Sequence, residues 1–122
     1  MARVWPLLLP LALAGCQTGQ SGAGRPAFPA RLEAIGTEPF WSISLDATRL
    51  VWTDPDEAGE SIAVTRREHA GVLEVDGELK AGRLHMAIRR AACSDGMSDF
   101  GYRYQDKLTI GANTWPGCAG RR

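Results

Sequence analysis

Apolar and polar residues alternate along most of this chain, and this period of two constrains the fold more than any other feature. From Leu32 onward, no window of about twelve residues carries apolar side chains at helical spacing. The segment LHMAI at positions 84–88 shows the pattern most clearly, because positions 84, 86 and 88 would share one face of a strand. The pattern predicts an all-β chain.

Alternating segments and turn signals divide the chain into about six to eight short strands. Residues 41–45 and 49–53 flank the turn Asp46-Ala47-Thr48 and are expected to form a hairpin. Short strands with turns about every 8 to 12 residues are typical of a small antiparallel β-barrel or β-sandwich. Further strands are expected at residues 61–66, 72–79, 84–88, 102–104, 107–110 and 114–118.

Two stretches bear on how these strands connect and pair. Residues 54–60 are acidic and contain Pro55 and Gly59, so we expect them to form a loop. The pair Asp76-Gly77 lies inside the strand expected at residues 72–79. It fits either a tight two-residue turn or a bulged strand, and the register there stays open.

The N-terminus has the pattern of a secretion signal. An apolar run over residues 4–13 contains two prolines and is too short to cross a bilayer as a helix. Residues 1–15 are followed by Cys16, and the quartet LAGC at positions 13–16 resembles the lipobox of bacterial lipoproteins. The resemblance implies that the peptide is cut before Cys16, that its thiol carries diacylglycerol and that the new amine is acylated.

Lipidation at Cys16 makes the lipid bilayer the first expected partner. Two or three acyl chains give a stable anchor, whereas one chain holds only marginally. Gln17 stands in place of the Asp that signals inner-membrane retention, which favours the outer membrane, facing the periplasm. The alternative is a soluble secreted protein in which Cys16 stands near the cleavage site by chance.

Residues 17–29, QTGQSGAGRPAFP, are rich in Gly, Ser, Gln and Pro. This composition predicts a flexible tether between Cys16 and a β domain at residues 30–120. Without residues 1–15, which carry one charge at Arg3, 13 basic residues face 14 acidic ones, a formal charge of −1. The balance gives no reason to expect nucleic acid as a partner.

Cys93 and Cys118 are the two cysteines that remain once Cys16 carries lipid. Exported proteins fold in an oxidising compartment, and an even count favours a disulfide between the two. A metal site is the weaker alternative, because His69 and His85 fall into no Cys/His ligand spacing. A reactive thiol is a further alternative, but it would have to stay reduced, and the compartment of an exported protein is oxidising. We expect a structural disulfide, which stabilises a domain of marginal size.

Four segments together resemble a known group of proteins. They are GTEPFW at 36–41, CSDGMSD at 93–99, the tyrosine-rich segment at 102–104 and GCAG at 117–120. The combination resembles a family of uncharacterised bacterial envelope lipoproteins, whose members are sometimes joined to META-type, heat-shock-lipoprotein-like domains. Phe100 stands where that family commonly has an Arg, and the Pro usual among its tyrosines is absent here. The resemblance implies an envelope location but no established activity.

The segment after Cys93 is the main candidate for a binding loop. Its Asp-Gly pair is a turn signal and its Ser and Asp side chains can accept hydrogen bonds from the backbone, which predicts a rigid, self-bonded loop. Such a loop is either purely structural or a binding surface, since function concentrates on loops held by a scaffold. Calcium binding by two of its carboxylates is a third alternative, although their spacing does not match an EF-hand. The candidate residues are Ser94, Asp95, Gly96, Met97, Ser98 and Asp99.

Aromatic and basic residues outside this loop have two interpretations each. Phe40 and Trp41 are expected in the core with Trp52 and Trp115, and an aromatic surface formed by this pair is the alternative. The pairs Arg66-Arg67 and Arg89-Arg90 fit solvated charges at strand ends, or contacts with anionic envelope polymers.

The sequence offers little support for catalysis. It contains no Gly-x-Ser-x-Gly elbow, no His-Glu-x-x-His pair and no phosphate-binding loop. His85 alternates with apolar Leu84 and Met86 and is expected on the solvent side. We therefore expect a protein that is not an enzyme and that carries no cofactor or metal.

Together these features predict a membrane-anchored envelope lipoprotein that binds an envelope protein or polymer through residues 94–99. A structural role in envelope maintenance is the first alternative. The second is a protein similar to the membrane-bound inhibitors of c-type lysozyme, an analogy that rests on fold and anchor alone.

Overall fold

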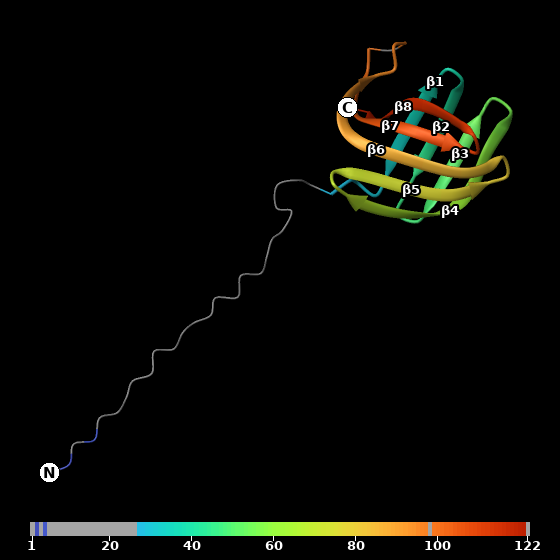
Figure 1. The fold of residues 1–122 in the computed structure, drawn as a ribbon. Helices are drawn as coiled ribbons and strands as arrows, with labels where there is room; N and C mark the ends of the chain where they lie inside the picture. The colour runs from blue at the N-terminus through green and yellow to red at the C-terminus, as the bar shows by residue number, and fades with distance from the viewer. Residues whose placement is uncertain (1, 3, 5–26, 98, 122) are drawn as a thin grey trace.

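Eight antiparallel strands form a closed barrel in which each strand pairs with its neighbours in sequence and the last strand returns to the first (Figure 1). The structure, a computed structural model, describes residues 2, 4, 27–97 and 99–121, so residues 1–15, Cys16 and Ser98 lie wholly or partly outside this description. The all-β class, the small antiparallel barrel and the single disulfide are confirmed. The strands are β1 (Leu32–Thr37), β2 (Phe40–Leu45), β3 (Arg49–Asp54), β4 (Glu57–His69), β5 (Val72–Leu79), β6 (Gly82–Ser94), β7 (Gly101–Ile110) and β8 (Asn113–Arg121).

The barrel interior is filled by the apolar positions of the period-two pattern. Alternation places every second side chain inside, and burying one large aliphatic side chain contributes about 1.5 to 3 kcal/mol. The rings of Trp41 and Trp52 stack inside with centroids 6.1 Å apart. Within the described residues, no helix is long and apolar enough to span a membrane. The largest fully buried side chains are Ile43, Leu50, Leu73, Val75, Leu84, Met86, Ile88 and Leu108.

Phe28 packs against the barrel, although it stands ahead of the domain boundary that the sequence suggests at Ala30. The Phe28 ring is only 6% exposed, and its centroid lies 5.3 Å from that of Tyr104. The Arg90 guanidinium carbon lies 4.2 Å from the same ring. One aromatic residue among glycines and prolines gave no periodic signal, yet it covers one end of the core. Phe28 therefore belongs with the barrel rather than with the tether.

Arg66 holds this N-terminal segment in place. Its guanidinium donates hydrogen bonds to the carbonyl oxygens of Pro29 (3.0 Å), Ala30 (2.6 Å) and Asp46 (2.9 Å). A guanidinium presents several donors in a fixed plane and can serve several acceptors at once. Arg66 is thus a structural donor, and it does not fit the solvated strand-end charge that the sequence suggests.

The prediction of a loop over residues 54–60 is wrong. β3 ends at Asp54 and β4 begins at Glu57, so only two residues separate the strands. One Asp54 carboxylate oxygen accepts hydrogen bonds from the backbone N–H groups of Asp56 (2.8 Å) and Glu57 (2.7 Å). This local bonding makes a tight turn. The acidic composition correctly indicated an interruption between two strands. The hydrogen bonds to the Asp54 side chain limit this interruption to a two-residue turn.

Asp76 and Gly77 lie inside β5, and neither forms a turn. Gly77 pairs with Val64 on β4 and with Leu84 on β6. An added Cβ at Gly77 would lie 2.8 Å from Ile62 Cδ1. Gly77 therefore provides space for side chains of β4 at the point where β4 leaves β5.

Two glycines let Trp41 lie across the line where the barrel closes. Gly36 on β1 and Gly117 on β8 both turn toward the interior, and a Cβ at Gly36 would overlap the Trp41 indole. A Cβ at Gly117 would lie 2.7 Å from Trp41 Cζ2 and 2.7 Å from Asp106 Oδ1. The indole occupies the space that two side chains would otherwise fill.

We predict that Gly117→Ala destabilises the barrel by about 1 to 3 kcal/mol, the usual cost of overpacking a core. The added methyl group would also meet Ile35 O at 2.5 Å, and backbone cannot rotate away as a flexible side chain can. Urea unfolding measures the effect, with Lys107→Ala on the outer face of β7 as the control. Equal stability of Gly117→Ala and wild type would show that the closure does not depend on this space.

Candidate functional site

A disulfide joins Cys93 near the end of β6 to Cys118 in β8, with the two Cα atoms 5.6 Å apart. This confirms the predicted pairing. Cys118 faces outward, because alternation turns Gly117 and Ala119 inward, yet it is only 3% exposed. Residues 93–95 lie over this part of the wall and line a groove of about 140 Å³ with residues 35–37 and 116–118. The disulfide therefore fastens the end of β6 to the outer surface near the β1–β8 closure.

The segment after Cys93 is bonded to itself. Asp95 Oδ1 accepts a hydrogen bond from Met97 N (2.9 Å), and Ser94 Oγ accepts one from Gly96 N (3.2 Å). The Tyr102 hydroxyl donates to Asp95 Oδ2 (3.1 Å). Gly96 has a φ of 74°, a left-handed conformation that glycine adopts without strain. These bonds hold residues 94–97 in a defined turn, as both the structural and the binding interpretations require.

Large apolar side chains project from this loop into solvent. Met97 is 68% exposed and Phe100 is 46% exposed. The Arg121 guanidinium carbon lies 3.3 Å from the centroid of the Phe100 ring, a cation–π contact that orients the ring. The loop thus combines a fixed backbone with exposed apolar groups.

The pair Phe40 and Trp41 is divided by the alternation of β2. Phe40 is 56% exposed, whereas Trp41 is 3% exposed and packs in the core. The prediction of an aromatic surface is therefore wrong for Trp41, and the prediction of a core position is wrong for Phe40. Adjacent residues of a strand point to opposite sides, so both cannot share one role.

Asp106 is the residue with unusual chemistry that sequence reasoning missed. It is 5% exposed on the inner face of β7, and within the described residues neither carboxylate oxygen has a hydrogen-bond partner. Burial raises the pKa of Asp106 to about 7. Trp41 Nε1 also lacks a partner there. The signal was present in the sequence, because Asp106 stands in phase with Leu108 and Ile110.

Both histidines lie on the outer wall around Glu74. His69 Nε2 contacts Glu74 Oε2, His85 Nε2 lies 3.5 Å from Glu74 Oε1, and His85 Nδ1 lies 2.9 Å from Asp76 Oδ1. The hydrogen bond from His69 is the largest cause that lowers the pKa of Glu74, and Arg67 adds to it. Within residues 27–97 and 99–121, no three side chains are arranged to hold a metal ion.

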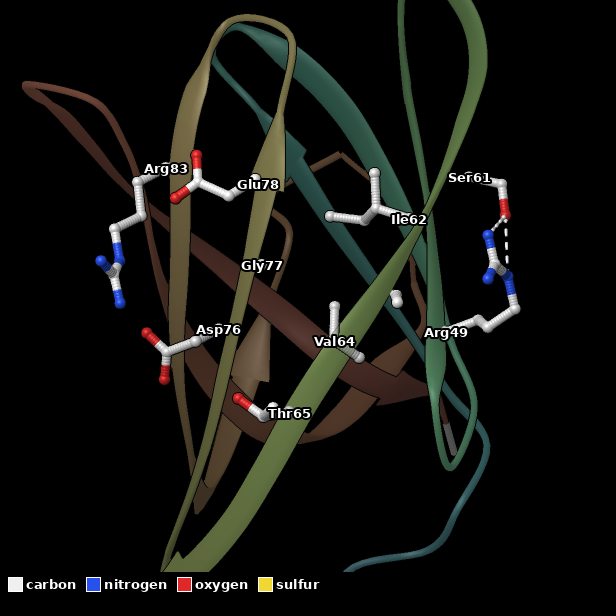
Figure 2. Close-up of a pocket in the computed structure, with 10 residues that line it drawn as sticks. Arg49, Ser61, Ile62, Val64, Thr65, Asp76, Gly77, Glu78 and Arg83 are labelled. Carbon is white, nitrogen blue, oxygen red and sulfur yellow. Dashed lines mark hydrogen bonds between the residues drawn. The ribbon is translucent and has the colours of Figure 1, made fainter.

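A second groove, of about 560 Å³, opens where β4 leaves β5 (Figure 2). The pairing of β4 with β3 runs from Glu57 to Ala63, whereas its pairing with β5 begins only at Val64. Figure 2 shows the Arg49 guanidinium bonded to Ser61 Oγ on one wall, at 3.1 and 3.3 Å. Acidic Asp76 and Glu78 stand with Arg83 on the other wall, so the charges are mixed and indicate no ligand class.

Comparisons with protein-family models, with curated proteins and with solved structures found no match.

We predict that Asp106 makes the barrel less stable as the pH rises toward and through 7. Its folded pKa of about 7 exceeds the ordinary value of 3.8, so its contribution to stability is complete below pH 4 and is lost as the pH rises through the folded pKa. The full shift corresponds to about 4 kcal/mol. Asp106→Asn removes this dependence, and the difference between the two proteins in urea unfolding from pH 4 to 8 isolates it. Parallel curves would contradict the assignment.

We also predict that replacing both Cys93 and Cys118 by Ser lowers the free energy of unfolding by about 3 kcal/mol. The bridge closes a separation of 25 residues, which restricts the unfolded chain. Thermal unfolding under non-reducing conditions measures the loss, and Ser94→Ala, which keeps the disulfide, serves as the control. A loss below about 1 kcal/mol would mean that the hydrogen bonds of the fold carry this region without the bridge.

Proposed function

We propose that this chain is a membrane-anchored envelope lipoprotein whose barrel presents the loop after Cys93 to an envelope protein or polymer. The observation that carries the proposal is the exposure of Met97 and Phe100 on a backbone fixed by a disulfide and by its own hydrogen bonds. A rigid loop loses little conformational entropy when it binds, and exposed apolar side chains supply contact area.

The lipid anchor rests on the sequence around Cys16. The apolar run before it, the LAGC quartet and the Gly-rich residues that follow are those of a tethered lipoprotein. In Figure 1, residues 27–31 reach the barrel beside the β4–β5 end, whereas the segment between β6 and β7 projects from the barrel away from them. That arrangement leaves the loop accessible in a protein held by its N-terminus.

A structural role in envelope maintenance is the competing function, and the hydrogen bonds of Asp95 favour it. The two functions differ in what the loop's exposed side chains do. A purely structural loop needs Asp95 and the disulfide but has no use for an exposed Met97. A binding loop needs the fixed backbone and also the exposed Met97 side chain.

The test places a photoreactive residue at position 97 in the full chain and irradiates intact cells. We expect a discrete crosslinked product, absent when the photoreactive residue stands at Val51, an exposed apolar position in β3. Labelled palmitate should mark the wild type but not Cys16→Ser, and loss of the anchor should reduce the crosslink. No product at position 97, or the same product at both positions, would reject presentation by the loop.

Two variants separate binding from stability. Met97→Ser removes an exposed apolar side chain, so the melting temperature should stay within about 2 °C of wild type while the capture of the partner falls. Asp95→Ala removes two hydrogen bonds and should lower the melting temperature. If capture survives Met97→Ser and falls only with the melting temperature, the structural function is correct.

A further inference from the structure

A groove of about 530 Å³ lies on the outer wall across β5, β6, β7 and β8, and no residue of the loop after Cys93 lines it. Its volume is in the range of small-molecule sites, about 300 to 1,000 Å³. Apolar Val72, Ala87 and Pro116 contribute to its surface, and Arg89, Gln105 and Lys107 stand beside them. None of these residues takes part in the proposed presentation of the loop.

Cross-strand register explains why a groove forms here. Ala87 on β6 pairs with Lys107 on β7, and Lys107 pairs in turn with Pro116 on β8. The next outward-facing row toward the end of β6 runs from Val72 through Arg89 to Gln105. The short side chain of Ala87 leaves a depression between the long ones on the same strand, because same-facing residues are two positions apart.

The groove is cationic. Arg89 and Lys107 form no ion pair with any carboxylate of the described residues. Asp106 reaches the groove only with its backbone, since both of its carboxylate oxygens are buried inside the barrel. Glu74 pairs with Ala87, but it does not line the groove and is already bonded to Arg67 and the two histidines. Two positive charges therefore border an apolar surface without a counter-charge.

The Arg89 guanidinium is hydrogen-bonded to a neighbouring strand. One of its terminal nitrogens donates to Gln105 Oε1 at 3.0 Å, which holds the guanidinium against the wall. A guanidinium has five N–H donors, so most of them stay available. A held guanidinium binds the oxygens of an acidic group more favourably than a mobile one, because less side-chain entropy is lost.

We propose that this groove binds a small anionic amphiphile, a molecule with a carboxylate or phosphate head and a short hydrocarbon tail. Arg89 and Lys107 hold the head, and Val72, Ala87 and Pro116 contact the tail. The occupant is a free molecule rather than a bilayer surface, because recruitment to anionic membranes takes clusters of about four to eight basic residues. The proposal does not depend on the loop or on lipidation.

The test titrates octanoate and, separately, octyl phosphate into the full chain carrying Cys16→Ser and follows backbone amide shifts by NMR. We expect saturable shifts of the Ala87 and Lys107 amides at low millimolar ligand concentration. Octanoate and octyl phosphate should saturate at similar concentrations if the site recognises the negative charge rather than one particular head group. Acetate lacks the tail and octyltrimethylammonium has the opposite charge, so neither should saturate. Arg89→Gln and Lys107→Gln should each weaken octanoate binding about five-fold, as expected for a charge contact near the surface.

Lys80→Gln is the matched control, since Lys80 is exposed and lies outside the groove. It should bind octanoate as the wild type does. The proposal is overturned by a lack of saturation with both anions, by equal binding of octyltrimethylammonium, or by unchanged binding in the Arg89 and Lys107 variants. Binding to anionic vesicles that depends on Arg89 while free octanoate does not bind would replace the free amphiphile with a membrane surface.

Discussion

The indole of Trp41 lies across Gly36 and Gly117, and the closed barrel depends on this contact. The pairing of β1 with β8 spans only Ala34↔Ala119 and Ile35↔Cys118, a shorter register than that of any other neighbouring strands. Few backbone hydrogen bonds can therefore hold this line of the wall. Packing of a large aromatic ring over two glycines joins β2, β1 and β8 from inside, and a barrel closed in this way leaves no free sheet edge at β1 and β8.

The same region carries an unfavourable charge and a compensating covalent bond. Asp106 points into the core beside Gly117, where Ile88 pairs with it from β6 and supplies no counter-charge. An unpaired buried carboxylate costs several kcal/mol when ionised, which is why its pKa rises. The Cys93–Cys118 disulfide links the two strands that flank β7 and restricts separation of β6 and β8. A domain of this size has a small stability margin, so the two effects are of comparable weight.

The sequence was informative where a feature is local and silent where it depends on partners distant in the chain. Alternation predicted strands and buried faces, because the direction of a side chain follows from position in a strand. Counting cysteines predicted the disulfide. The exposure of Met97 follows from its place in a turn. Alternation does not show which strands are neighbours or which residues lie opposite each other. It therefore could not reveal that Ala87, Lys107 and Pro116 form one row across β6, β7 and β8. Phe28 was missed because its partners, Tyr104 and Arg90, lie far along the chain.

A rigid barrel also explains how one small domain can carry two separate surfaces. Interior side chains are closely packed, so substituting them lowers the stability of the barrel. Outward-facing side chains of the same strands can be substituted without disturbing that packing. On β7, the side chains of Asp106 and Leu108 face the core while those of Gln105 and Lys107 face the groove, so the two sets of side chains alternate along the strand. The loop after Cys93 is fixed differently, by a disulfide and by its own side chains. The groove takes its shape from register and the loop takes its shape from local bonds, so different interactions shape the two surfaces.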